Sequence, residues 1–267
     1  MFLQAFSIYL IISYSKYHEA VFSKASNEFT GKINSKYHSI GQYFDLKRTN
    51  DSLIKENEFL YNQLKADFGT QDSLHKIVID TIKIDSFNQY RKYQYEFARV
   101  VSNSVTAQNN YLVIDKGEKE GIRIGMGVVS TNHSIVGIVT EVSEKYSVIM
   151  SLLHKDSHIS GKLTRKGETG TISWNGVEPN YVTLNNIPKS SKIYKGDSVI
   201  SSGFSTAFPK GIMIGRVEAF YLDKSSNYTK IKCKTSTDFY NIEYVYVIKN
   251  LDQQGVEEVL EKTKKQP

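Results

Sequence analysis

The chain has only one cysteine, Cys233, among its 267 residues. A single cysteine excludes an intrachain disulfide and a metal site built from several thiolates, although it leaves a location outside the cytoplasm open. In residues 228–235, Ile231 and Cys233 alternate with lysines. This alternation predicts a half-buried strand in which the cysteine serves as a small apolar side chain.

Charged side chains are missing from residues 2–15, which are mostly apolar. As a helix this segment would extend roughly 20 Å, less than the ~30 Å hydrocarbon core of a bilayer. A signal peptide is disfavoured because no basic residues precede the segment and no small-x-small cleavage site follows it. We therefore predict a membrane anchor over residues 1–15, incomplete as it stands. Without flanking basic residues, its orientation cannot be predicted from charge.

Proline is absent from residues 17–65, and glycine occurs there only at Gly31 and Gly41. Within this stretch two series of residues recur at intervals of seven, the second three positions after the first. The first series, called a, is Tyr43, Asn50, Asn57 and Leu64, and the second, called d, is Leu46, Leu53 and Leu60. Such a heptad pattern is typical of a coiled coil.

Leucine at d and asparagine at a favour a parallel dimer, because buried asparagines pair in only one register. We predict a helix and coiled coil over residues 16–68, with dimerisation through Leu46, Asn50, Leu53, Asn57, Leu60 and Leu64. The alternative is one amphipathic helix that lies on its own globular domain. Two asparagines at the same heptad position argue against it, since a monomeric core rarely buries polar amides.

Beyond Phe97, short apolar runs alternate with glycine turns, which is typical of an all-β sandwich or barrel. Residues 122–130 align without gaps to residues 193–201, and residues 136–139 align to residues 214–217. One repeat in each half suggests two small barrels of similar plan. The predicted fold is therefore mainly β with an N-terminal helix. Its parts are an anchor (1–15), helix and coiled coil (16–68), a connector with a possible edge strand (69–96), a first β-barrel subdomain (97–157 and 236–250), a second β-barrel subdomain (158–235) and a polar tail (251–267).

Structural turn positions are predicted in the β-domain from glycine, proline and aspartate. They are Gly125, Gly196, Asp197, Gly203, Pro209, Gly211 and Gly215.

Catalytic and cofactor motifs are scarce. Gly196-Asp197-Ser198 is reminiscent of a chymotrypsin-like protease, but Val199 and Ile200 follow where a tight oxyanion turn would be needed. His133 and Asp156 are the nominal partners of that serine, without supporting motifs. His154, Asp156 and His158 could share a strand face as metal ligands or be ordinary loop residues, and the loop is the commoner case. We predict no catalytic residue, no metal and no cofactor.

The net charge is +6, with a sequence pI near 9.0. This balance permits contact with nucleic acid, an anionic lipid or an acidic polymer. However, acidic residues lie among most of the basic ones, which is typical of a solvated surface. Because basic residues interleaved with aromatics occur only in a short run at residues 91–95, no nucleic-acid partner is predicted.

Three segments resemble the rod shape-determining protein MreC family: residues 111–129, 195–217 and 238–248. The resemblance covers residues 17–250. It implies a non-enzymatic scaffold of the cell-wall elongation machinery that maintains cell shape. It further implies a single-pass inner-membrane protein with most of the chain in the periplasm, a homodimer or higher self-assembly, and binding to a penicillin-binding transpeptidase, to MreD and indirectly to actin-like MreB.

The chain departs from that family at its start, where members carry a short basic stretch and a full-length membrane helix. Two other interpretations stay open. The chain could be a periplasmic adaptor of an export system, although such adaptors usually fold their coil back as a hairpin within the β region. A chymotrypsin-like serine protease is the enzymatic alternative.

Overall fold

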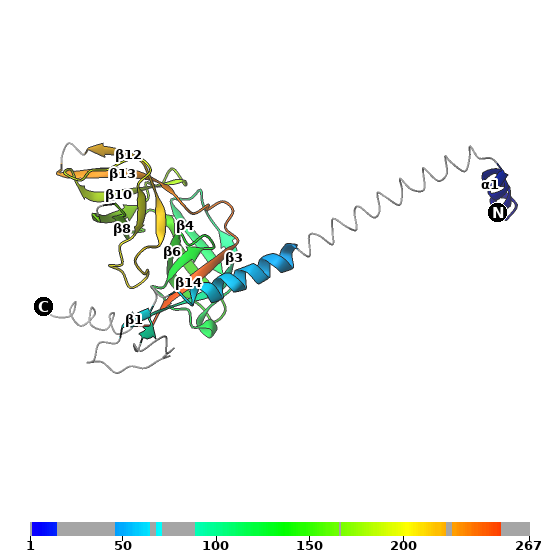
Figure 1. Cartoon of the computed structure of the whole chain (residues 1–267), viewed down its shortest axis with the longest axis horizontal. Helices are drawn as coiled ribbons and strands as arrows, with labels where there is room; N and C mark the ends of the chain where they lie inside the picture. Colours follow the sequence, from blue (N-terminus) through cyan, green and yellow to red (C-terminus); the bar gives the residue numbers. More distant parts are fainter. Residues whose placement is uncertain are drawn as a thin grey trace. The chain divides into compact units, whose positions relative to one another are not determined.

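The computed structural model describes residues 2–14, 46–64, 68–70, 89–165, 167–222 and 226–251 (Figure 1). The chain divides into two units, residues 1–54 and residues 55–267. The first unit contains α1 (Phe2–Tyr14), a helix without charged residues. A second helix covers residues 46–61 and crosses the boundary between the units. Within the described residues, no helix combines the length and the apolar character needed to cross a membrane.

The first barrel is a closed antiparallel sheet with the strand order β14-β3-β4-β7-β6-β5. It closes where β14 pairs with both β3 and β5, so the last strand of the described residues is essential to it. Closure leaves no unpaired sheet edge. Its strands are β3 (Tyr93–Asn103), β4 (Asn109–Ile114), β5 (Gly127–Ser130), β6 (Ile135–Val142), β7 (Ser147–His154) and β14 (Tyr244–Asn250).

The second barrel is inserted between β7 and β14, with the strand order β10-β13-β12-β11-β8-β9. Figure 1 shows its strands in a group of their own beside the first barrel. The strands are β8 (Ile159–Leu163), β9 (Thr169–Ser173), β10 (Tyr181–Pro188), β11 (Ser198–Ser201), β12 (Met213–Leu222) and β13 (Tyr228–Thr235). A separate two-stranded sheet pairs β1 (Phe68–Thr70) with β2 (Gln89–Arg91).

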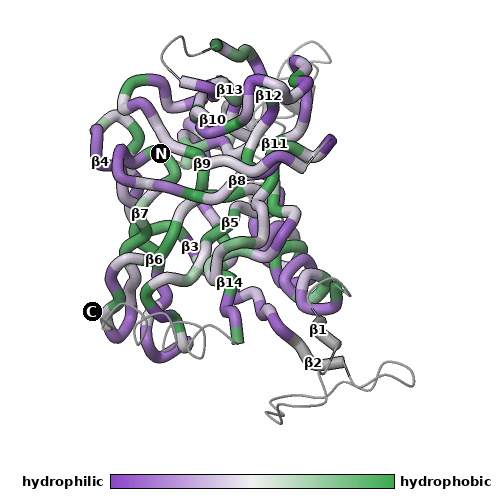
Figure 2. Tube along the Cα trace, turned by 90° about the vertical axis from the view of Figure 1, so that its left-hand side faces the viewer, coloured by the Kyte–Doolittle hydropathy of each residue, from purple (hydrophilic) through white to green (hydrophobic). Residues whose placement is uncertain are grey.

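Alternation of side chains along the strands gives each barrel its own core. On β4, Leu112 and Ile114 are fully buried, and on β13 Ile231 and Cys233 are. Burial raises the pKa of the Cys233 thiol to about 12, so the cysteine behaves as the small apolar residue predicted from the sequence. Figure 2 shows the hydrophobic segments along β3, β5, β6, β7 and β14 of the first barrel.

Polar groups join the two barrels where the chain passes between them. Thr237, in the segment from β13 to β14, has its Oγ1 2.7 Å from Ser134 Oγ and donates a hydrogen bond to the Ile135 carbonyl. Ser134 also forms an isolated β-bridge with Met213 of β12. The Asn250 amide reaches across to the Thr206 carbonyl in the loop between β11 and β12. Since each of these buried polar groups has a partner, the contact between the barrels is specific as well as close.

The predicted fold class, mainly β with two small barrels and an N-terminal helix, is confirmed. The membrane anchor and the coiled coil stay predictions. Tyr43 of the heptad pattern, most of the connector and nearly all of the polar tail lie outside the described residues.

Candidate functional site

The residues predicted to form the coiled coil lie exposed along the helix over residues 46–61 and the turn after it. The four leucines are between 42% and 68% exposed, and Asn50 and Asn57 are exposed as well. Heptad spacing places these side chains on one side of a helix. A stripe of leucines open to water is the feature expected of a helix whose partner is another chain.

A different side of the same helix packs on the first barrel. Glu58, Tyr61 and Asn62 are spaced by three and four positions, so they share a face, and all three are partly buried. They lie outside the a and d series. The last turns of the helix therefore have two distinct faces. One packs on the first barrel, and the other is open to solvent.

Tyr61 fixes the helix through an aromatic cluster. Its ring stacks on His133 with the centroids 4.8 Å apart and the planes inclined by 20°. The rings of Tyr95 on β3 and Tyr246 on β14 lie 5.5 and 5.3 Å from it. Burial raises the pKa of Tyr246 to about 12 and lowers the pKa of His133, so the cluster is neutral near pH 7.

His133 lies at the turn between β5 and β6 with a φ of 59°, an uncommon value for a residue other than glycine. The Tyr61 hydroxyl donates a hydrogen bond to the carbonyl of the neighbouring Thr131. We call this contact between Tyr61 and the first barrel the joint. Sequence analysis missed it, because Tyr61 and His133 are 72 positions apart and share no motif. The sequence has 18 tyrosines, but this composition indicates strands as readily as an aromatic contact between a helix and a barrel.

Glu58 completes the joint on its polar side. Burial raises the pKa of its carboxyl, opposed by a hydrogen bond from the backbone of Phe97. Nearby, Lys249 Nζ lies 3.0 Å and Lys116 Nζ lies 3.6 Å from the Glu96 carboxylate. The two lysines offset the two carboxylates, so the helix end is held without unbalanced charge.

The side-chain amide of Asn62 forms two hydrogen bonds with the backbone of Tyr95 on β3. Its Nδ2 donates to the Tyr95 carbonyl at 3.1 Å, and its Oδ1 accepts from the Tyr95 N–H at 2.8 Å. We expect Asn62→Ala to lower the free energy of unfolding by about 1–3 kcal/mol, because both Tyr95 groups lose their partner. Urea unfolding measures this. Gln63→Ala, at the exposed neighbouring position, is the control and should cost little; equal losses in both variants would show that the Asn62 bonds contribute nothing.

The predicted turn residues lie in the barrels. Four glycines have a φ in the left-handed region, which favours glycine: Gly125 (87°), Gly196 (89°), Gly203 (85°) and Gly211 (104°). Asp197 accepts hydrogen bonds from the Tyr194 N–H and from Arg165 Nε. Pro209 lies in the loop between β11 and β12, two positions before Gly211. These residues shape turns and make no reactive arrangement.

Gly215 is not a turn residue, and that prediction is wrong. It lies inside β12, paired with Val199 on one side and Thr235 on the other. A Cβ at this position would lie 2.2 Å from the Lys234 carbonyl oxygen. Glycine is required there because two backbones approach closely.

The residues considered for catalysis or metal binding are engaged elsewhere. Arg216 Nη1 donates a hydrogen bond to Ser198 Oγ on the second barrel, whereas His154 on the first barrel contacts the Tyr111 hydroxyl. His154 Nδ1 accepts from the Asp156 N–H, and His158 Nδ1 contacts the Asp156 carbonyl. In the part of the chain that the structure describes, no three His, Cys, Asp or Glu residues are grouped to hold a metal ion.

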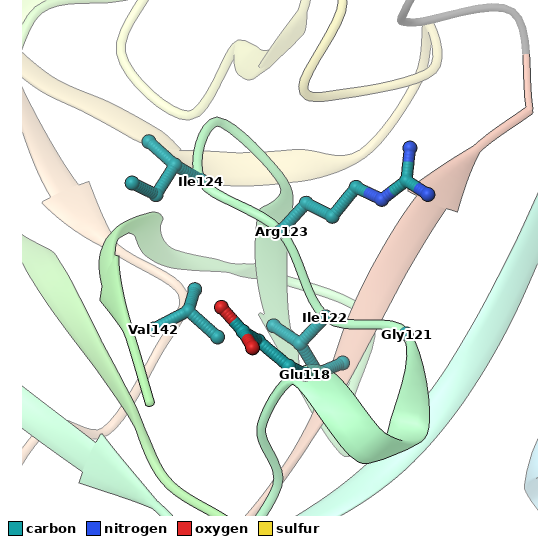
Figure 3. A pocket seen from close by; sticks show the side chains of 6 residues that line it. All are labelled: Glu118, Gly121, Ile122, Arg123, Ile124 and Val142. Carbon is teal, nitrogen blue, oxygen red and sulfur yellow. The ribbon is translucent and has the colours of Figure 1, made fainter. Parts of the chain in front are cut away.

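A hollow of about 530 Å³ lies beside the short 3₁₀ turn at residues 118–120. Figure 3 shows the Glu118 carboxylate directed toward Val142 and the Arg123 guanidinium directed away from it. Ile122 and Ile124 supply the remaining larger side chains. Because its charged groups diverge, the hollow has none of the convergent polar groups that fix a small ligand.

Comparison with known proteins places this geometry in a family. A model of the barrel core of the rod shape-determining protein MreC matches residues 100–249. The chain belongs to the MreC family. The match begins within β3 and ends within β14, so it includes the strands of both barrels.

The cell shape-determining protein MreC of Listeria monocytogenes is 28% identical over 216 residues, covering 79% of this chain and 72% of that protein. The chain spans less than two thirds of the MreC proteins of Haemophilus influenzae and Escherichia coli. An MreC structure from Listeria monocytogenes has a TM-score of 0.56 at 24% identity, covering 84% of this chain and 96% of that one. A structure of the major periplasmic domain from the cell shape-determining filament MreC has a TM-score of 0.52 at 21% identity, covering 60% and 97%. At these identities the structures show the fold alone.

Proposed function

We propose that this MreC-family chain is a non-enzymatic scaffold of the cell-wall elongation machinery, which dimerises and binds a penicillin-binding transpeptidase. Membership of a family of cell shape-determining proteins supports the role. The observation that carries it is the helix with two faces. One face is fixed to the first barrel by Tyr61 and Asn62, and the other exposes the leucines of the heptad pattern.

This arrangement suits a scaffold because it links self-association to the placement of the barrels. A parallel pair of helices would bring two copies of the first barrel to fixed positions, since each helix end is held by hydrogen bonds and ring contacts. The dimer would then present two copies of both barrels to its partners, which we propose are the transpeptidase, MreD and, indirectly, MreB.

We place the protein in the inner membrane as a single-pass protein, with the barrels in the periplasm. The uncharged helix α1 supports an anchor at the N-terminal end. The solved periplasmic domain with the same fold supports the location of the barrels. Expression of the chain with and without residues 1–15, followed by membrane sedimentation, tests the anchor: only the longer chain should sediment with membranes.

Catalysis is not part of the proposal, and Ser198 provides the test. The hydroxyl accepts a hydrogen bond from Arg216 at 3.2 Å on the outer surface of the second barrel. Ser198→Ala is expected to leave the restoration of cell shape in a strain lacking the protein unchanged. Loss of rod shape with a folded Ser198→Ala protein would restore the enzymatic interpretation.

The proposed function is tested by purifying the chain from crosslinked membranes and probing for the penicillin-binding transpeptidase. The transpeptidase is expected to co-purify, and depletion of the chain is expected to turn rod-shaped cells round. Rod-shaped cells after depletion, with no transpeptidase in the purified material, would contradict the proposal.

A further inference from the structure

The first half of β3 has one backbone edge that its neighbouring strand does not reach. β4 pairs with β3 from Val100 to Asn103. On the opposite side of β3, the Val100 N–H donates to the Glu243 carbonyl beside β14. Because the amides of a strand point alternately to its two sides, those of Tyr95 and Phe97 point away from β14, toward the edge that β4 leaves uncovered.

The end of the helix covers this edge with two side chains. Asn62 Oδ1 accepts a hydrogen bond from the Tyr95 N–H at 2.8 Å, and the Glu58 carboxyl accepts one from the Phe97 backbone. A backbone amide that is removed from water needs such a partner. Release of the helix from the first barrel would therefore uncover both amides of β3 together.

His133 is the histidine at the centre of the joint. Its ring stacks on Tyr61 and lies 5.7 Å from the ring of Tyr95, inclined by 44°. In the part of the chain that the structure describes, its buried Nδ1 has no hydrogen-bond partner. A proton on this nitrogen would therefore be a buried, charged donor without an acceptor, which is more costly than the bare nitrogen of the neutral ring.

The groups around His133 do not compensate for a positive charge. The helix presents Tyr61 to it and β3 presents Tyr95, while Tyr246 of β14 packs on Tyr61 from another side. The other residues of its turn, within 131–134, are uncharged. Burial alone lowers the pKa of His133, and no charged side chain of the described residues contributes. The face of Tyr61 would attract an imidazolium, but the lowered pKa indicates that lost hydration outweighs this attraction.

We propose that the joint is an acid-sensitive latch, in which protonation of His133 releases the helix end from the first barrel and uncovers the edge of β3. In the released state the ring would be in water, where a histidine has a pKa of about 6.5. The pKa is lower in the docked state, so docking is undisturbed above about pH 6.5 and weakens as the pH falls below that value.

Glu58, the other titratable group of the joint, acts with the opposite sign. Burial raises the pKa of its carboxyl and Glu96 adds to the increase, whereas Lys116 and Lys249 oppose it. A raised pKa in the docked state means that protonation of Glu58 strengthens docking. A helix that is released as the pH falls therefore owes its release to His133.

This inference goes beyond the proposed scaffold role and does not rest on it. The joint lies within one chain, whereas dimerisation concerns the open face of the helix. Sedimentation measures the dimer and a local probe of β3 measures the latch, so either can fail while the other holds.

Amide hydrogen exchange of the full chain, followed at single amides by NMR and corrected for intrinsic rates, tests the latch. The Tyr95 amide reports release of the helix because Asn62 is its partner, and the Val100 amide reports opening of the barrel itself. The ratio of released to docked helix is expected to rise several-fold from about pH 7.5 to about pH 5.5. About tenfold is the ceiling for one proton with a free pKa near 6.5. Val100 should keep its protection.

Three variants separate the groups of the joint. His133→Phe keeps an aromatic ring against Tyr61 but takes up no proton, so the protection of Tyr95 should stay within about twofold over this pH range. His133→Asn suits the positive φ but removes the ring, so it should lower the protection by the same factor at both pH values. Glu58→Gln keeps an acceptor for the Phe97 amide and should retain the wild-type response to acid.

His154 on β7 provides the matched control, because burial lowers its pKa too but its ring contacts the Tyr111 hydroxyl. His154→Gln should leave the response of the Tyr95 amide unchanged. An equal response to pH in the wild type and in His133→Phe would overturn the proposal. A parallel loss of protection at Tyr95 and Val100 would do so as well, since the whole barrel would then be opening. Where His133→Phe does not fold, a wild-type response to acid in His133→Asn is the contradicting result.

Discussion

Replacing Leu53 and Leu60 with aspartate is expected to convert a dimer into a monomer whose barrels stay folded. Both leucines are more than half exposed in the single chain, so the substitution costs the monomer little. In a dimer the same positions would be buried at d, where a carboxylate loses its hydration without a partner. The effect should therefore fall almost entirely on association.

Analytical sedimentation of residues 17–250 measures this result, and circular dichroism checks that the β-domain persists. Phe59→Asp is a matched control, because Phe59 is 57% exposed and adjacent to Leu60 but lies outside the a and d series. Only the leucine variant should shift to the monomer. A wild-type monomer at tens of micromolar would remove the dimer from the proposed function and leave the barrels to bind partners alone.

Replacing the asparagines at the a positions is expected to have the opposite effect on the coiled coil. Asn50 and Asn57 are exposed in the single chain and would face their counterparts in a parallel dimer. Replacing both with leucine is expected to raise the melting temperature of the coiled coil and to admit larger oligomers beside the dimer. Neither effect is expected if the helix packs only on its own barrel.

The two faces of this helix differ in how far the sequence predicts them. The open face was predictable from the local repeat of leucine and asparagine every seven residues, because residues seven apart lie on the same side of a helix. The fixed face depends on His133, Tyr95 and Tyr246, which reach Tyr61 only after the first barrel has closed. Contacts between residues so far apart in the chain leave no periodic signal, so the joint emerged only from the structure.

The barrels show the same contrast between local and distant determinants. Glycines in turns were predictable, since the left-handed φ at Gly203 and Gly211 accompanies local signals such as Pro-Lys-Gly. The neighbours of β13 were not predictable, because its alternating lysines predicted a strand without revealing its partner. Only the register shows that Lys234 faces Arg216.

Gly215 is a position whose role was not predictable from the sequence and whose substitution we expect to cost much of the stability. In the sequence, Ile214-Gly215-Arg216 reads equally well as a turn or as a strand with one glycine. The structure shows that the Lys234 carbonyl carbon would lie 3.0 Å and its oxygen 2.2 Å from an added Cβ. Both atoms belong to the backbone of β13, so no side-chain rotation can relieve the clash, and the ladder between β12 and β13 must shift.

We therefore expect Gly215→Ala to lower the free energy of unfolding by about 3 kcal/mol, near the upper end for overpacked sites. Gly196→Ala is the matched control, because its φ is 89° but nothing lies within 4 Å of an added Cβ. That substitution should cost only about 1–2 kcal/mol of backbone strain. For a domain of this size, the melting temperature should fall by about 6–12 °C for Gly215→Ala and by about one third to two thirds as much for Gly196→Ala. Calorimetry of the two variants measures these melting temperatures. An equal or larger drop for Gly196→Ala would show that β12 shifts to accommodate the methyl group. The close approach of β12 to β13 would then not be the reason that position 215 requires glycine.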